Sequence, residues 1–256
     1  MDPSVKGRAR QQKAGGLAAF YLATAFVAAM PYFLVFVKYP SVVDPAEKVA
    51  MLAGNQGSMR VMYLVSYILF GIVLAVLALA LYARLKDDAP VLAQAATAVG
   101  LIWAVVLVAS GLIFNAGVVA VAGLHGTDPA QAVAAWQAIE PIAQGLGGSG
   151  GELLGGLWVL LVSVAALRTG GLPKVLNWFG VAIGAAGVLS VVPALSDVAY
   201  GFGLLVIVWF AWLGVAMLRS PSRAAAPAGI TATTSASAAA NATTLGSRKT
   251  PAPQNG

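Results

Sequence analysis

Long apolar runs separated by short polar segments dominate the chain. A run of about 20 residues, at 1.5 Å per residue, reaches across a hydrocarbon layer of about 30 Å. Such runs cover residues 15–37, 61–83, 91 to about 124, 145–167, 175–195 and 202–218. The third run is too long for one untilted crossing, and we expect its span to cover 91–114. We therefore expect an all-α, polytopic integral membrane protein with six transmembrane helices, connected in part by a charged turn at 84–90 and a short turn at 168–174.

Two longer connections carry the same helix-start signal. Asp44-Pro45-Ala46-Glu47 and Asp128-Pro129-Ala130-Gln131 each place an Asp cap before a Pro, with Glu or Gln three residues after the cap. They predict two short helices on the outer surface, and Trp136 in the second connection is expected to anchor at the membrane interface. The motifs lie 84 residues apart. An internal duplication and a capping motif that arose twice both explain this spacing.

The composition decides the class of protein. Hydrophobic residues make up 59% of the chain and charged residues only 9%, against about 25% charged residues in soluble proteins. There is no cysteine, and His125 is the single histidine, so disulfides, thiolate sites and multi-histidine metal sites are excluded. The chain also lacks a phosphate-binding loop and an HExxH motif. We expect no cofactor, no metal and no enzymatic activity.

The distribution of charge predicts the topology. The net charge is +6, and 12 of the 15 Lys and Arg residues fall in segments that six spans place on one face. Lys38, Lys48 and Arg60 fall on the other face. The excess of Lys and Arg on one side predicts that both termini lie in the cytoplasm. It also argues against nucleic-acid binding, because the basic residues flank apolar runs.

The ends of the chain differ from its middle. Residues 1–14 are polar and basic, and we expect a loosely ordered cytoplasmic N-terminus. Residues 15–218 form the predicted six-helix transmembrane domain. Residues 219–256 are rich in Ala, Thr, Ser and Pro without periodicity, which predicts a disordered cytoplasmic tail.

Glu152 is the only acidic or basic residue inside any of the apolar runs. A charge at the bilayer centre costs about 2.5–3.5 kcal/mol, so such a residue usually faces the protein interior or water. One interpretation places Glu152 inside the helix bundle. The other begins a helix near Glu152 and leaves its carboxylate in the headgroup layer, where an acid suits the helix dipole.

Small residues predict where helices pack. Gly148, Gly155 and Gly156 share a helix face with Glu152, and Gly180 and Gly184 form a GxxxG pair. Both groups allow another helix to approach closely, either within the chain or from an oligomer or membrane partner. The tryptophans inside the runs are expected to be packing residues, and they are Trp103, Trp158, Trp209 and Trp212.

Four more polar residues complete the candidate polar site around Glu152. Asn115 and His125 fall toward the outer end of the third run, and Lys38 and Arg60 fall at the outer ends of the first two. A buried Glu152 would hold a proton, bind a cation or pair with Arg60, Lys38 or His125. The simpler alternatives are snorkelling for Lys38 and Arg60, a backbone hydrogen bond for Asn115 and a solvated loop for His125.

Four stretches of the chain resemble a known family. They are residues 55–60 (NQGSMR), 80–86 (ALYARLK), 156–158 (GLW) beside Glu152, and 171–174 (GLPK) with Trp178, Gly180 and Gly184. Together they resemble the bacterial DUF4386-type membrane proteins over about residues 15–218. The resemblance implies six spans and a bacterial plasma membrane, and it implies no activity or functional residue.

Two functions are consistent with these features of the sequence. The first is a non-catalytic accessory protein that binds lipid or a partner through its glycine faces. The second is a carrier of a small solute, cation or proton that uses Glu152. An intramembrane enzyme is the weakest alternative, because Glu152 has no second catalytic group beside it.

Overall fold

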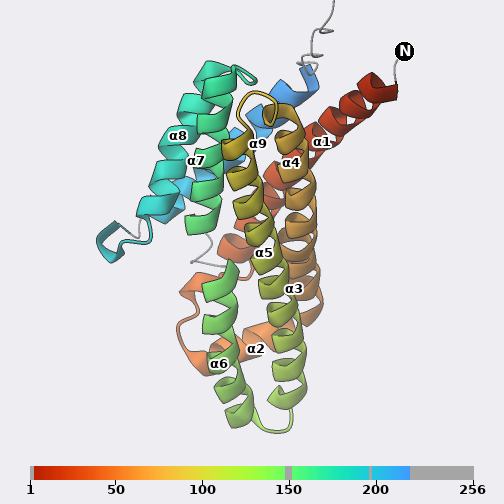
Figure 1. The fold of residues 1–256 in the computed structure, drawn as a ribbon. Helices are drawn as coiled ribbons and strands as arrows, with labels where there is room; N and C mark the ends of the chain where they lie inside the picture. The colour runs from red at the N-terminus through yellow and green to blue at the C-terminus, as the bar shows by residue number, and fades with distance from the viewer. Residues whose placement is uncertain (1–2, 148–151, 196–197, 220–256) are drawn as a thin grey trace, which may run out of the picture. The chain divides into compact units, whose positions relative to one another are not determined.

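The structure, a computed structural model, describes residues 3–147, 152–195 and 198–219, and every regular element among them is helical (Figure 1). These residues belong to one compact unit. In chain order the elements are α1 (Pro3–Pro31), the π-helical η1 (Tyr32–Phe36), the 3-10 turn η2 (Tyr39–Ser41), α2 (Pro45–Gly54), α3 (Gln56–Tyr63), the π-helical η3 (Leu64–Leu69), α4 (Phe70–Leu85), α5 (Pro90–His125), α6 (Pro129–Gly147), α7 (Glu152–Thr169), α8 (Lys174–Leu189), the 3-10 turn η4 (Pro193–Leu195) and α9 (Val198–Arg219).

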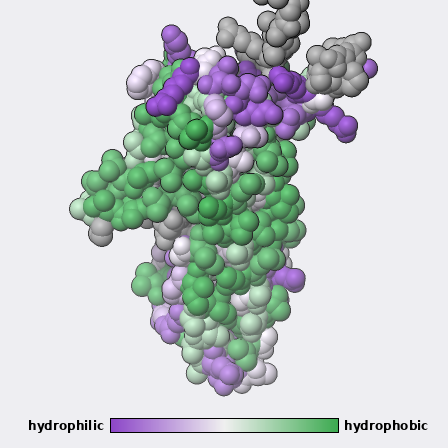
Figure 2. All heavy atoms as spheres, in the orientation of Figure 1, coloured by the Kyte–Doolittle hydropathy of each residue, from purple (hydrophilic) through white to green (hydrophobic). Residues whose placement is uncertain are grey.

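Five helical stretches in the described part of the chain are long and apolar enough to cross a membrane. They are Lys6–Ser41, Gln56–Leu85, Pro90–His125, Pro129–Thr169, which runs over residues outside the description, and Gly201–Arg219. Figure 2 shows broad hydrophobic surface along these helices. The chain is therefore a polytopic membrane protein. The sixth predicted span corresponds to α8, whose 16 residues reach only about 24 Å.

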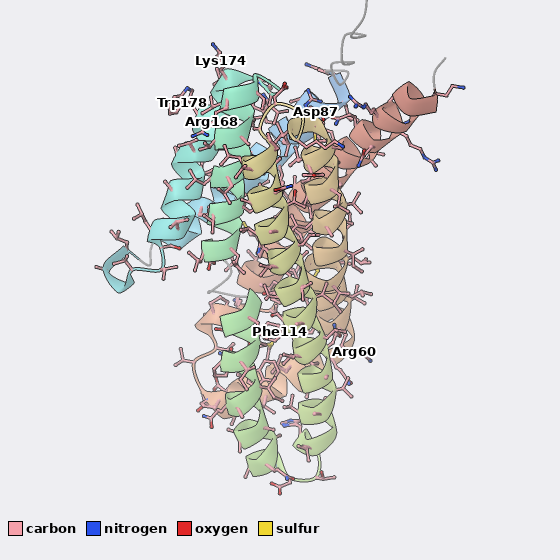
Figure 3. All side chains as sticks on the ribbon, in the orientation of Figure 1. Arg60, Asp87, Phe114, Arg168, Lys174 and Trp178 are labelled. Carbon is pink, nitrogen blue, oxygen red and sulfur yellow. The ribbon has the colours of Figure 1, made fainter. Side chains whose placement is uncertain are left out.

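Hydrogen bonds join α1, α4 and the α7–α8 turn at one end of the unit. The Arg84 guanidinium donates from Nε to the Gly171 carbonyl at 2.9 Å and from Nη1 to the Gln12 side chain at 2.7 Å. Asp87, Arg168 and Lys174 lie at the same end (Figure 3). The N-terminal segment and the turns at 84–90 and 168–174, which the distribution of Lys and Arg predicts to lie on one face of the membrane, are thus close in space. We call this end the Arg84 end.

Two separate cores stabilise the fold. The first lies between α1, α4, α5, α7, α8 and α9 and includes Trp103, Trp158 and Trp209, which are confirmed as packing residues. Trp212 is 37% exposed. The second core joins α2, α3, α6 and the last turns of α5. We call these four segments, with α5 counted from Phe114 to His125, the distal head.

The distal head corrects three expectations. The predicted span over 91–114 is part of a longer helix, because α5 continues unbroken to His125 over 36 residues, or about 54 Å. The second surface helix is not short, because α6 extends over 19 residues, from Pro129 to Gly147. Trp136 is 1% exposed and packs inside the head, so it is not an interfacial anchor. Packing against α6 supports α5 beyond the length that a bilayer requires.

The N-terminal segment also differs from expectation. It is helical from Pro3 rather than loosely ordered, because α1 runs continuously from the basic residues into the apolar stretch. Contacts of its first turns with the Arg84 end support this extension, since Gln12 is only 6% exposed. The predicted disordered tail lies, from residue 220 onward, outside the described residues.

Both predicted helix caps are confirmed. The Glu47 amide donates to Asp44 Oδ1 at 2.9 Å, and the Gln131 amide donates to Asp128 Oδ1 at 3.0 Å. Duplication and repeated capping chemistry predict the same local geometry, so both explanations of the 84-residue spacing stay open.

Candidate functional site

Glu152 lies at the first described residue of α7. Its side chain is half-buried, and Oε2 is buried with no hydrogen-bond partner among the described residues. The backbone around it is tightly packed, since a Cβ added at Gly187 of α8 would lie 3.0 Å from the Glu152 carbonyl oxygen. Tyr67 is close enough for a Coulombic interaction with the carboxylate. Tyr67 lies where the two cores meet, since it packs against both of them.

A π-helical turn positions Tyr67. Residues Leu64–Leu69 form η3, and short π-helical insertions inside α-helices occur frequently at functional sites. The Tyr21 hydroxyl donates to the Val65 carbonyl at 2.9 Å, which satisfies a backbone group within this turn. The Tyr67 ring packs edge-on against Phe114 at 5.6 Å, so its position is held by both backbone and aromatic contacts.

The structure does not join Glu152 to the other predicted site residues. Arg60 and Lys38 are exposed, and Figure 3 shows Arg60 at the side of the distal head. His125 ends α5, and its buried Nδ1 has no hydrogen-bond partner in the described part of the chain. Asn115 is half-buried on α5. No ion pair or hydrogen bond between described residues connects any of these four to Glu152.

A different carboxylate, Glu140 of α6, has three polar side-chain partners. Its Oε1 accepts hydrogen bonds from the Tyr39 hydroxyl at 2.6 Å, the Gln144 side chain at 3.0 Å and the Lys48 ammonium at 3.3 Å. The Lys48 and Glu140 side chains are only 18% and 17% exposed. The Lys48 ammonium also lies 4.9 Å from the centre of the Tyr39 ring, where a cation–π attraction adds to the ion pair. We call these four residues the Glu140 cluster.

The turn before Tyr39 explains how this residue reaches α6. Lys38 has φ +49°, the left-handed conformation that costs a non-glycine residue about 1–2 kcal/mol. The Ser41 hydroxyl donates to the Lys38 carbonyl at 2.8 Å and closes the turn. The chain thereby reverses after η1, and the Tyr39 side chain turns toward Glu140.

The sequence interpretation missed this cluster because it predicted only a short surface helix in this connection and did not consider Glu140. One signal could have found it. Trp136, Glu140 and Gln144 follow one another at four-residue intervals, which places them on one face of a helix. A large apolar residue on that face would have indicated that Glu140 is partly buried and needs a partner.

The predicted packing glycines lie in contacts within the chain. A Cβ at Gly156 would lie 2.7 Å from the Val188 amide nitrogen, and one at Gly184 would lie 2.8 Å from the Gly156 carbonyl oxygen. Gly155 meets the Trp103 ring, and Gly180 meets Ser163 and Trp209. Gly148 lies outside the described residues. These glycines therefore allow α7, α8 and their neighbours to approach one another.

The interior of the first core is tightly packed. A small cavity between α4, α5 and α7 cannot hold a water molecule, and apolar side chains dominate its wall, which consists of Ala78, Leu81, Tyr82, Leu85, Ala93, Ala96, Thr97, Trp158 and Val162. Among the residues that the structure describes, no group of three or more His, Cys, Asp or Glu could hold a metal ion.

Comparison with known proteins identifies the family to which the chain belongs. No curated protein and no solved structure matches the chain. Residues 17–218 match the family described as "Domain of unknown function (DUF4386)", and this range covers every described helix from the apolar part of α1 to the end of α9. The chain therefore belongs to the DUF4386 family.

Proposed function

We propose that this is a non-catalytic, lipid- or partner-binding protein of the bacterial plasma membrane, with six spans and both termini in the cytoplasm. The sixth span in this topology is α8, lengthened by the apolar residues that follow it, including Val191 and Val192. The pairing of α1 with α9 supports an even number of spans. A Cβ at Gly16 would lie 2.7 Å from the Leu218 side chain, so the start of the first span lies beside the end of the last.

The single observation that carries the proposal is the packing of the first core. Its cavity cannot hold a water molecule, and its tryptophans are buried among other aromatic rings, with Trp158 and Trp209 at 5.8 Å. A carrier or intramembrane enzyme needs polar groups along a path or around a substrate. The surfaces that remain for recognition are the apolar exterior, the basic Arg84 end and the distal head.

The test is reconstitution of the purified protein into liposomes. We expect proton, sodium and potassium fluxes no faster than those of protein-free liposomes, and we expect phospholipid to remain bound when the detergent-solubilised protein is examined by native mass spectrometry. A saturable flux that Glu152→Gln abolishes would overturn the proposal.

One observation favours a carrier as the second candidate. The buried Oε2 of Glu152 has no described hydrogen-bond partner, and an ionisable residue at membrane depth often marks an ion or proton pathway. Under this alternative, Glu152→Gln would stop transport and Tyr67→Phe would change its rate.

Under the non-catalytic proposal, Glu152→Gln has a modest effect on stability. We expect the free energy of unfolding at neutral pH to stay constant or to rise by up to about 1 kcal/mol, because the amide carries no charge to bury and breaks no described ion pair. Chemical denaturation in detergent measures this change. Glu47→Gln is the control, since Glu47 is exposed and should change stability by less than about 0.5 kcal/mol. A large destabilisation by Glu152→Gln would show that the carboxylate has an essential partner.

A further inference from the structure

The first turns of α1 carry four basic residues and no described acidic residue. Lys6, Arg8, Arg10 and Lys13 are all exposed, and α1 contains no acidic residue from Pro3 to Pro31. Figure 1 shows the beginning of α1 extending beyond the neighbouring helices at the Arg84 end, and Arg8 still pairs there with Asp87. Basic side chains directly before an apolar span lie at the level of lipid headgroups.

A second basic group lies at the same end, on α7 and α8. Arg168 and Lys174 are exposed beside the turn that joins these helices, and Figure 3 shows both at this end with Trp178. Trp178 is 64% exposed and Val175 is 67% exposed. An exposed indole next to Lys and Arg is typical of the boundary between headgroups and acyl chains.

Positive charge exceeds negative charge at this end. The acidic residues described there are Asp87 and Asp88 in the α4–α5 turn, and Asp87 already pairs with Arg8 at 3.7 Å. Exposed Lys86 and Arg219 add to the basic groups. Figure 2 shows hydrophilic residues gathered at this end directly above the hydrophobic surface of the helices.

We propose that the Arg84 end binds anionic phospholipids, with the phosphates against the basic residues of α1, Arg168 and Lys174 and the acyl chains against the apolar surface below them. This inference rests on the proposed function and names its lipid class. Basic residues near a membrane surface each favour an anionic lipid by about fivefold. The adjoining apolar surface and Trp178 favour a lipid over a soluble polyanion, because a soluble partner would leave them uncovered.

The experiment measures lipid retention by native mass spectrometry, with the full-length protein purified from mixed micelles of phosphatidylcholine and phosphatidylglycerol. One variant combines Arg168→Gln with Lys174→Gln. A second combines Lys6→Gln, Arg10→Gln and Lys13→Gln, and it leaves the Arg8–Asp87 pair intact. The control combines Lys38→Gln with Arg60→Gln, two exposed basic residues away from this end.

We expect the wild type to retain phosphatidylglycerol in preference to phosphatidylcholine. The preference should fall by about tenfold or more in each basic-end variant and stay unchanged in the control. Raising the salt concentration should weaken it in the wild type, because ions screen exposed charges; this measurement tests the proposal even if a variant fails to fold.

Equal retention of the two lipids by the wild type, or an equal loss in the control, would overturn the inference. Retention of both lipids without preference would leave the proposed function standing. A Glu152-dependent flux would overturn the proposed function and leave the lipid preference intact, so the two failures are distinguishable.

Discussion

Gly184→Ala is expected to force α8 away from α7 and to destabilise the protein by at least about 2–3 kcal/mol, the upper part of the usual cost of overpacking. A Cβ at this position would lie 2.7 Å from the Leu160 amide nitrogen and 2.8 Å from the Gly156 carbonyl oxygen. Both are backbone atoms, so no side chain can rotate to make room. The free energy of unfolding, measured by denaturant titration in detergent, gives the effect.

Gly123→Ala is the matched control for this prediction. Gly123 is also a helical glycine, but a Cβ there would meet nothing within 4 Å. Alanine favours a helix over glycine by up to about 1 kcal/mol, so this variant should be as stable as the wild type or more so. If both variants behave alike, the close approach of α7 and α8 is not what stabilises this part of the fold.

Glu140→Gln is expected to destabilise the distal head by about 2–3 kcal/mol. The substitution leaves the Lys48 ammonium, whose side chain is 18% exposed, without its carboxylate. Breaking a fully buried pair in this way costs about 3–5 kcal/mol, and the remaining exposure of both side chains lowers that figure. Proteolysis within α2 or α6 should become faster as well, because the Glu140 cluster ties η2, α2 and α6 together.

A double-mutant cycle separates the interaction energy of the Glu140–Lys48 ion pair from the effect of lost packing on stability. Adding Lys48→Met to Glu140→Gln removes the uncompensated charge, so the double variant should recover at least about 1 kcal/mol relative to Glu140→Gln. The comparison pair is Arg8–Asp87, with side chains 43% and 55% exposed. Asp87→Asn should cost under about 1 kcal/mol, since exposed ion pairs contribute little. Additive effects of Glu140→Gln and Lys48→Met would show that the pair does not couple the two helices.

Local features of this protein follow from short stretches of sequence. The apolar runs predict helices long enough for a membrane because each run is continuous along the chain. Asp44 and Asp128 predict their helix starts because capping depends on residues within one turn. The apolar runs do not determine which tryptophans are buried, since Trp209 is buried and Trp212 of the same run is 37% exposed.

The candidate site was only partly predictable. Glu152 can be identified from the sequence because it is the only acidic residue in an apolar run. The sequence does not determine which side chains lie near it in space. The structure leaves Arg60 and Lys38 exposed and places Tyr67 near Glu152 instead. Tyr67 reaches this position from a π-helical turn, and no short motif distinguishes such a turn from the α-helix on either side.

The sequence alone thus determined the membrane class, the helical runs and the helix caps, because each depends on neighbouring residues. Only the tertiary structure decided that α5 and α6 extend into a distal head and that Glu140 pairs with Lys48, 92 residues away. It also decided that the α7 and α8 glycines face each other. These features depend on contacts between distant segments, which local sequence patterns do not reveal.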